Sequence, residues 1–434
     1  MKGKDRPALM RIARFLPESV FLRSVGMLTG GTVLAQGVLA LSLPVLTRLY
    51  TPEDFNVLAA FASTLGLITV ASCLRFNIAI PLAEDDRVAM NLLMLALASA
   101  AVVCLLVVAP VLFVPGAVAA LLRQPRMEPH LWMIPVGVLL ASSYDALQYW
   151  ASRKRRFALV AQTRVSRAVG GAATQIGIGA VSASPFGLIL GQVVYSGLGV
   201  FGLARSLTRH DWKASVGELS WASMKRDAHA YRRFPQFSVP EALFNTAGVE
   251  LSVLIIAAVA AGPEAGFLML AMRVMGLPMG LVGSSVGQVY LAEAPQRLRD
   301  GQLGAFTRRM MWTLFKTGAP ALGATAVACP LLFPLIFGVE WGRAGVLVVW
   351  LTPMFILQFV ASPVSMLLHV TGKLATAMWL QVIGGILRIG AISAAALLAP
   401  SHVTEVFAVS GAAFYMGMAA IIGLQVRALG RIHG

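Results

Sequence analysis

The sequence predicts an all-α integral membrane protein with about twelve transmembrane helices in two six-helix halves. The chain has 434 residues, of which 58% are hydrophobic, and its mean hydropathy is +0.77. Only 12% are charged, against about a quarter in an ordinary soluble domain. Long apolar runs recur along the chain, and parts of the sequence repeat at a similar offset. Because a helix satisfies its own backbone polar groups in lipid, each run is expected to be helical.

Twelve apolar runs are separated by charged residues or by Pro and Gly. A helix of roughly 20 apolar residues can cross the hydrocarbon core of a bilayer. The basic segment 1–24 precedes the first run, which has full span length and no small-residue cleavage site at its end, so we expect a retained helix rather than a signal peptide. In chain order the predicted spans are 25–46, 56–82, 88–114, 130–150, 157–181, 184–204, 236–261, 264–291, 311–337, 344–370, 374–399 and 403–426.

The distribution of basic residues gives the predicted orientation. With a cytoplasmic N-terminus, 25 of the 35 Lys and Arg residues fall on the inner side, four on the outer side and six inside spans. The positive-inside rule favours this arrangement, and one missed or added span would reverse every later loop. The net charge of +16 is therefore explained without nucleic-acid binding, which needs a basic folded face. Both termini are expected to be cytoplasmic.

Two weak repeats suggest a duplicated architecture. The segment 51–61, "TPEDFNVLAAF", resembles 262–272, "GPEAGFLMLAM", and 132–143 resembles 349–362 at a similar offset. Parallel repeats of this kind are typical of secondary transporters, with the substrate path between the halves. We predict an N-terminal lobe at 25–204, a basic cytoplasmic linker at 205–235 and a C-terminal lobe at 236–434.

One stretch carries a family resemblance. It reads "LPVLTRLYTPEDF" (43–55) and continues through "LRFNIAIPLAEDD" (74–86). The stretch resembles the polysaccharide-unit flippases, also called O-antigen translocases or Wzx-like proteins, of the multidrug/oligosaccharidyl-lipid/polysaccharide (MOP) exporter superfamily. Two residues depart from the family pattern: Asn56 replaces the usual glycine and Asn77 the usual glutamate. The second departure leaves Arg75 without an acid close to it in the sequence.

The resemblance implies a fold of the MOP/MATE-like type and a function. A flippase of this family would move an undecaprenyl-diphosphate-linked oligosaccharide repeat unit from the cytoplasmic to the periplasmic leaflet of the bacterial inner membrane, for O-antigen, capsule or exopolysaccharide assembly. The expected mechanism is alternating access, with no cofactor and with coupling to a proton or sodium gradient. The implied partners are the lipid-linked oligosaccharide, membrane lipids, a polysaccharide polymerase and a chain-length regulator.

Ionisable residues inside the predicted spans are candidate functional groups, because each is costly to place in lipid. Guanidinium groups donate paired hydrogen bonds to phosphate, so four arginines within the spans are expected to line a central cationic cavity for the diphosphate. These are Arg164, Arg167, Arg273 and Arg388. Arg75 lies nearer the inner end of its span and is a further candidate, although a side chain there can also reach the membrane surface.

Three acids also fall inside the predicted spans: Asp145, Glu241 and Glu250. Each could neutralise a neighbouring arginine, or it could bind the coupling ion. In the span 157–181 a polar stripe continues from the two arginines through Gly171, Thr174 and Gln175, as expected of a cavity wall.

Other classes of function fit the sequence less well. A cation-coupled drug or small-molecule exporter of the same superfamily would share the fold, and a peptidoglycan-precursor flippase usually has two further helices. An enzyme is not expected, because the longest outer loop spans only residues 115–130 and no catalytic motif appears. The three cysteines, Cys73, Cys104 and Cys329, lie in apolar runs without metal-binding or redox spacing.

Overall fold

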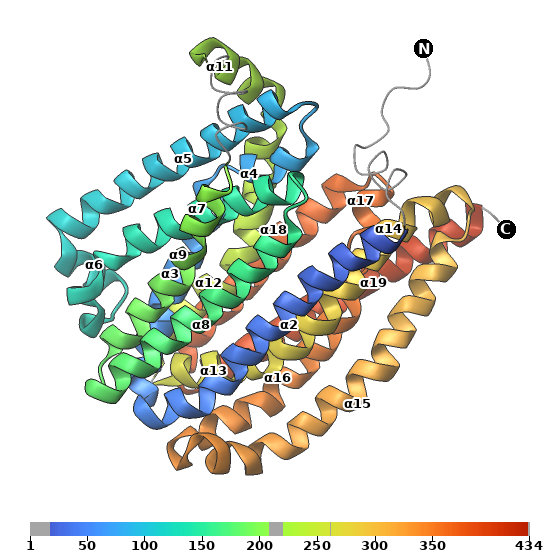
Figure 1. The fold of residues 1–434 in the computed structure, drawn as a ribbon. Helices are drawn as coiled ribbons and strands as arrows, with labels where there is room; N and C mark the ends of the chain where they lie inside the picture. The colour runs from blue at the N-terminus through green and yellow to red at the C-terminus, as the bar shows by residue number, and fades with distance from the viewer. Residues whose placement is uncertain (1–17, 208–219, 261, 433–434) are drawn as a thin grey trace. The chain divides into compact units, whose positions relative to one another are not determined.

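The structure is a computed structural model that describes residues 18–207, 220–260 and 262–432. Within these ranges nearly every residue lies in a helix and none lies in a strand, so the all-α prediction is confirmed (Figure 1). The chain forms two compact units. The first comprises Met1–Leu39, Thr64–Leu121 and Pro125–Leu243, and the second comprises Ala40–Ser63, Leu122–Gln124 and Phe244–Gly434.

The first unit is a bundle of long helices with small residues at its closest contacts. Helix α8 packs along α9, and α7 packs on both α9 and α5 (Figure 1). A methyl group on Gly191 would lie 2.2 Å from the side chain of Gln175 and 2.8 Å from the carbonyl of Gly171, so a side chain there would force α8 and α9 apart. The helices are α2 (Glu18–Leu49, in part), α3 (Pro52–Ser72, in part), α5 (Asp86–Phe113), α7 (Met133–Arg153), α8 (Phe157–Val181) and α9 (Pro185–Arg205).

Short elements complete this unit. Helix α11 (Trp221–Ala230) contacts the beginning of α5, where the amide of Asn91 donates to Asp227 at 2.6 Å between two buried side chains. The remaining elements are α4 (Phe76–Ala79), η1 (Ile80–Leu82), α6 (Pro115–Leu121), η2 (Pro125–His130) and η3 (Phe234–Ser238).

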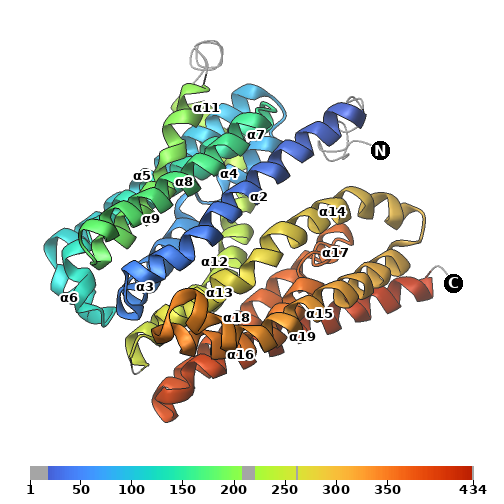
Figure 2. The same cartoon turned by 60° about the horizontal axis from the view of Figure 1, so that its bottom comes forward.

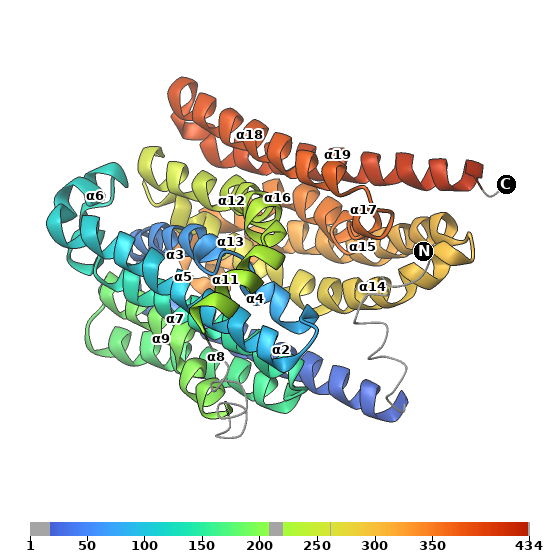
Figure 3. The ribbon, with the colours of Figure 1, turned by 90° about the horizontal axis from the view of Figure 1, so that it is seen from above.

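The second unit is also a helical bundle. Helix α16 contacts α15, α13 and α19, and α18 lies beside α19, as Figures 2 and 3 show. Trp341 is 1% exposed and its ring meets Phe55 and Phe267 edge-on at 4.8 and 5.9 Å between centroids. The elements are α12 (Val239–Val259, mostly in this unit), α13 (Glu264–Pro278), η4 (Met279–Gly283), α14 (Ser284–Arg299), α15 (Leu303–Phe337), η5 (Val339–Trp341), α16 (Gly342–Ala361), α17 (Leu367–Val370), α18 (Leu374–Leu398), η6 (Pro400–His402) and α19 (Val403–Ile432).

Every predicted span contains at least one of these helices. In the described part of the chain, nine helices are long and apolar enough to cross a membrane. The predicted spans outside this group correspond to α7, α8 and the broken segment α13–α14. Helices α7 and α8 carry Asp145, Arg164 and Arg167, which lower their hydropathy. The chain is a multi-pass membrane protein.

Two predicted spans end earlier than the sequence indicated, and a third is interrupted. The span 56–82 stops at Ser72, because Leu74 and Arg75 adopt positive φ angles of 46° and 60° and turn the chain. The span 264–291 is interrupted after Pro278 by a π-helical turn, as expected where proline removes a backbone donor. The span 344–370 ends at Ala361, before the short helix α17.

The turn at residues 46–56 is a partly buried structural element of the second unit. The carboxylate of Asp54 accepts from the backbone N–H of Thr51 at 3.1 Å, and Trp341 Nε1 donates to the carbonyl of Thr47 at 3.1 Å. Burial, reinforced by the charge of Asp54, raises the pKa of Tyr50 to about 12, so its hydroxyl remains protonated near neutral pH. The most distinctive phrase of the sequence therefore stabilises packing in this unit.

Asn56 ties this turn to its repeat partner. Its side-chain oxygen accepts from the backbone N–H of Ala265 at 3.1 Å, in the first turn of α13. Gly266 makes the approach feasible, because a methyl group there would lie 2.3 Å from the carbonyl oxygen of Pro52. The two repeated segments, 51–61 and 262–272, thus meet at their helix beginnings.

Candidate functional site

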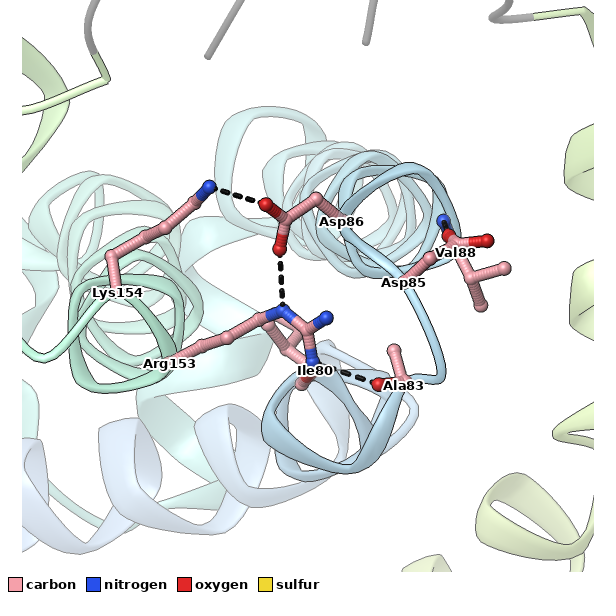
Figure 4. A network of polar contacts seen from close by, with 7 residues as sticks. All are labelled: Ile80, Ala83, Asp85, Asp86, Val88, Arg153 and Lys154. Atoms are coloured by element: carbon pink, nitrogen blue, oxygen red, sulfur yellow. Dashed lines mark hydrogen bonds and ion pairs between the residues drawn. The ribbon is translucent and has the colours of Figure 1, made fainter. Parts of the chain in front are cut away.

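The acidic pair at residues 85 and 86 has a structural role. Asp86 contacts Arg153 Nε at 3.0 Å and Lys154 Nζ at 2.6 Å, and Arg153 Nη1 also donates to the carbonyl of Ala83 at 2.8 Å (Figure 4). Asp85 caps α5 by accepting from the backbone N–H of Val88 at 2.7 Å. This network joins the beginning of α5 to the end of α7 and to the loop before α5. The charges of this motif thus hold these three segments together.

Arg164 and Arg167 lie on adjacent turns of α8 in the first unit. Arg164 Nη1 donates to the hydroxyl of Thr32 on α2 at 2.7 Å. Arg167 Nε donates to the carbonyl of Tyr195 on α9, and its guanidinium carbon lies 3.6 Å from the ring centroid of Tyr144 and 4.6 Å from that of Tyr195. Both arginines are half-buried. The ring faces and carbonyl solvate the Arg167 charge inside the bundle.

Asp145, on α7, is an acid whose charge acts on Arg167. It interacts electrostatically with both Arg167 and Arg75. Arg75 therefore has an acid after all, supplied by another helix instead of by position 77, although its Nε donates no hydrogen bond within the described residues. The structure thus places Asp145 where it interacts electrostatically with both Arg75 and Arg167, and its role stays a prediction.

The rest of the predicted polar stripe on α8 makes contacts within α8 and with α9. Gln175 is buried and its side-chain amide donates to the carbonyl of Leu188 on α9 at 3.1 Å. Thr174 donates to the carbonyl of Gly170 in its own helix at 2.8 Å. The stripe marks the contact between α8 and α9 beyond the two arginines, since polar and small residues are also used for helix packing in membranes.

The remaining predicted residues are distributed over both units. Glu241 lies at the beginning of α12 in the first unit and is half-buried. Glu250, further along α12 and in the second unit, forms a hydrogen bond with the hydroxyl of Ser63. Arg273 lies on α13, half-buried, in the second unit. Among the described residues no group of three or more His, Cys, Asp or Glu side chains could hold a metal ion.

Arg388, on α18, has the most unusual environment of the predicted arginines. It is only 3% exposed, and its guanidinium carbon lies 5.6 Å from the ring centroids of both Phe407 and Phe414 on α19. Its Nε has no hydrogen-bond partner, and no ion pair to Arg388 occurs in the part of the chain that the structure describes. Aromatic faces contribute about 1–2 kcal/mol to a buried cation, less than the several kcal/mol lost on desolvation.

Arg388 lines an open groove between α18 and α19, which we call the α18–α19 groove. The groove has a volume of about 960 Å³ and is almost entirely apolar. Trp379 and Leu387, on its α18 side, are 56% and 67% exposed. Glu405 and Val406 line one end, and Gly417 and Ile421 line the other. A buried cation without an acid thus lies beside a space that a ligand can enter.

A second charged cluster was not predicted. Arg343 Nε lies 2.9 Å from Glu264 Oε1 and Arg343 Nη2 lies 2.5 Å from Glu405 Oε1, while Thr404 donates to Glu264 at 2.9 Å. The four residues come from the beginnings of three helices, α13, α16 and α19. In the sequence each residue lies in a loop or a first helical turn, where polar residues are common. Nothing in the sequence around them therefore predicted that the four side chains would be in contact.

Comparison with solved structures identifies the fold. An inward-facing multidrug resistance MATE family transporter of the MOP superfamily aligns with a TM-score of 0.60 at 13% identity, over 91% of this chain and 96% of that chain. A mutant of the Vibrio cholerae MATE transporter VcmN gives a TM-score of 0.61 at 11% identity, over 95% and 97%. The eukaryotic MATE transporter AtDTX14 gives 0.57 at 11% identity, over 94% and 98%. The fold is that of the MOP-superfamily transporters.

The family follows from the sequence itself. The family model described as "Polysaccharide biosynthesis protein" matches residues 45–345, which is more than half of the chain. The chain therefore belongs to the polysaccharide biosynthesis protein family. A search among curated proteins finds no match.

Proposed function

We propose that this protein is a flippase that moves an undecaprenyl-diphosphate-linked oligosaccharide from the cytoplasmic to the periplasmic leaflet of a bacterial inner membrane. The observation that carries the proposal is the family match over residues 45–345, in a chain with a MOP-superfamily transporter fold. The product would enter O-antigen, capsule or exopolysaccharide assembly. Both termini would be cytoplasmic, as the distribution of basic residues favours.

The intramembrane arginines support an anionic substrate. Arg167 and Arg388 are each held inside a helical bundle, and the first is presented by aromatic rings and a carbonyl rather than by a contact ion pair. Guanidinium groups in such surroundings bind diphosphate through charge-assisted hydrogen bonds. Arg164, Arg273 and Arg75 remain candidates for the same role. Asp145, Glu241 and Glu250 are the candidates for coupling to a proton or sodium gradient.

The mechanism we propose is alternating access, which the MOP fold supports. The break in helix geometry after Pro278 supplies one place at which a span can bend. The cargo would pass to a polysaccharide polymerase and a chain-length regulator as partners.

The test is transport by the purified protein. Proteoliposomes would contain a prenyl-diphosphate-linked oligosaccharide in the leaflet inaccessible to an added lectin, and lectin binding would be followed over time. Exposure of the sugar should accelerate at least about tenfold over protein-free vesicles. Export of a cationic dye such as ethidium from the same vesicles, with no sugar exposure, would instead establish the drug-exporter alternative, which the multidrug MATE neighbour represents.

A further inference from the structure

We propose that the α18–α19 groove is a binding site for the prenyl diphosphate part of the substrate, with the diphosphate at Arg388 and the isoprenoid chain along the apolar walls. This inference rests on the proposed flippase function and adds to it a place of binding. Three features of the groove support this proposal. They are the lack of a carboxylate partner for Arg388 within the described residues, the apolar lining, and the position of the arginine along the groove.

The arginine is available to an anion. Its Nε has no hydrogen-bond partner, and within the described residues no carboxylate pairs with it. The acid that also lines the groove, Glu405, is already bound to Arg343 at 2.5 Å. An anionic ligand would therefore meet a positive charge that the protein has left without a counter-charge.

The walls fit a hydrocarbon chain rather than a hydrophilic anion alone. Trp379, Ile383 and Leu387 line the groove from α18, and Val409 and Ala413 line it from α19. A volume of about 960 Å³ is at the upper end of those that hold drug-sized molecules, so it takes a short segment of a long prenyl chain. Inorganic diphosphate would leave these walls uncovered, whereas a prenyl diphosphate would cover them.

The position of the charge matches an amphiphile with a head and a tail. A methyl group on Gly411 of α19 would lie 3.7 Å from Arg388 Nη2, so the guanidinium is level with that residue. Helical rise places Gly411 about 9 Å from Glu405 at one end of the groove and about 15 Å from Ile421 at the other. The longer arm, which is apolar apart from Thr376, is the place for the isoprenoid chain. The shorter arm leads toward the polar helix ends at Glu405.

The experiment measures binding to the purified full-length protein in detergent by native mass spectrometry and microscale thermophoresis. The probes are farnesyl diphosphate, farnesol and inorganic pyrophosphate. Farnesyl diphosphate should bind at least about tenfold more tightly than either farnesol or pyrophosphate. It is the only one of the three that can contact both Arg388 and the apolar walls of the groove. Equal binding of pyrophosphate would identify a free-phosphate site, and equal binding of farnesol would show that Arg388 does not contribute; either result overturns the proposal.

Two sets of variants test the two halves of the site, each with a matched control outside the groove. Arg388→Gln should weaken farnesyl diphosphate binding at least about tenfold, and Arg388→Lys should weaken it less, because lysine keeps the charge and loses the fork. Arg427→Gln, an exposed arginine on the same helix as Gly411 and outside the groove, should change binding less than about twofold. Unchanged binding by Arg388→Gln overturns the proposal.

The second set tests the apolar walls by filling the groove while Arg388 is left unchanged. Ala413→Trp adds bulk at an exposed groove position, so the variant should fold and yet lose binding at least about tenfold. Ala428→Trp, exposed on α19 and outside the groove, is the matched control and should bind as the wild type does. If Ala413→Trp binds normally, the groove is not the site. Binding at Arg388 without sugar exposure in the lectin assay would refute the flippase function alone, and sugar exposure without binding here would refute this site alone.

Discussion

Arg167 in the first unit and Arg388 in the second are both guanidinium groups within membrane helices, but their surroundings differ. Arg167 has the carbonyl of Tyr195, two aromatic rings and the field of Asp145. Arg388 has two aromatic rings at a greater distance, and its Nε has no acceptor. The first charge is largely solvated by the protein. The second is left for something else to solvate.

The comparison separates two uses of a buried charge. A charge with local partners contributes to the fold, and removing it leaves those partners unsatisfied. A charge without partners costs stability, and it is retained only where a ligand or another function needs it. The two arginines should therefore respond in opposite directions to the same apolar substitution, which gives the predictions below.

The largest expected effect is on Arg167→Met. The substitution removes the hydrogen bond to Tyr195, both ring contacts and the charge facing Asp145, so we expect the free energy of unfolding to fall by about 3–5 kcal/mol. Thermal denaturation in detergent, followed by a thiol-reactive dye on Cys73, Cys104 and Cys329, gives the measurement, because burial or helix packing now shields these thiols. A change below about 1 kcal/mol would mean that the first unit does not depend on this charge.

Arg388→Met is the opposing case. The substitution replaces an unpaired buried cation with an apolar side chain of similar length, so the free energy of unfolding should stay the same or rise by about 1 kcal/mol. Sugar exposure in the lectin assay should nevertheless fall at least about tenfold, since the diphosphate loses its guanidinium partner. A stable variant that still transports would remove Arg388 from the mechanism. A variant as unstable as Arg167→Met would show that the two charges are used alike.

The next effect concerns the Arg343 cluster. Here one arginine faces two carboxylates, whereas Arg388 faces none within the described residues. Arg343→Met leaves Glu264 and Glu405 facing the same space without a cation, and we expect a loss of about 2–4 kcal/mol. Glu264→Gln should cost less than half of that, because the amide oxygen can still accept from Arg343 and Thr404. The same denaturation assay compares the two. Equal losses would indicate that packing rather than charge holds these helix beginnings together.

A double-mutant cycle measures how much of the stability due to Arg167 comes from its interaction with Asp145, an interaction that Arg388 lacks. In the single variant Arg167→Met, Asp145 loses one of the two arginines that it faces and keeps Arg75. Adding Asp145→Asn removes this carboxylate, so roughly 1 kcal/mol of the single-variant loss should be recovered. The same asparagine added to Arg388→Met is the control, and its effect should add to that of the first substitution within about 0.5 kcal/mol. Additive behaviour in the first pair would place the stabilisation of Arg167 in its aromatic and carbonyl contacts alone.

The helical fold could be predicted because its causes are local. Apolar runs located each of the nine described helices that are long and apolar enough to cross a membrane, and the family resemblance indicated the MOP-type fold that the solved structures share. The points at which spans break were harder to foresee, since the positive φ of Arg75 and the π-turn after Pro278 depend on tertiary packing. Sequence alone found Arg388 but not its isolation, because a missing partner is a property of neighbouring helices. For the same reason it could not bring Arg343 together with Glu264 and Glu405.

The smallest expected effect concerns Asn56, which stands where the resembling family usually has glycine. It tests whether the hydrogen bond that Asn56 makes to Ala265 stabilises the protein. Asn56 accepts from the backbone N–H of Ala265, in the first turn of α13, so Asn56→Gly should lower the free energy of unfolding by about 1 kcal/mol, even though glycine is the usual residue in the resembling family. Asn56→Asp keeps the acceptor and adds a negative charge where the helix dipole favours it, so stability should be retained. Thermal denaturation of both variants measures the two free energies of unfolding. If the glycine variant were as stable as the wild type, the hydrogen bond between the two repeated segments would be incidental to their packing.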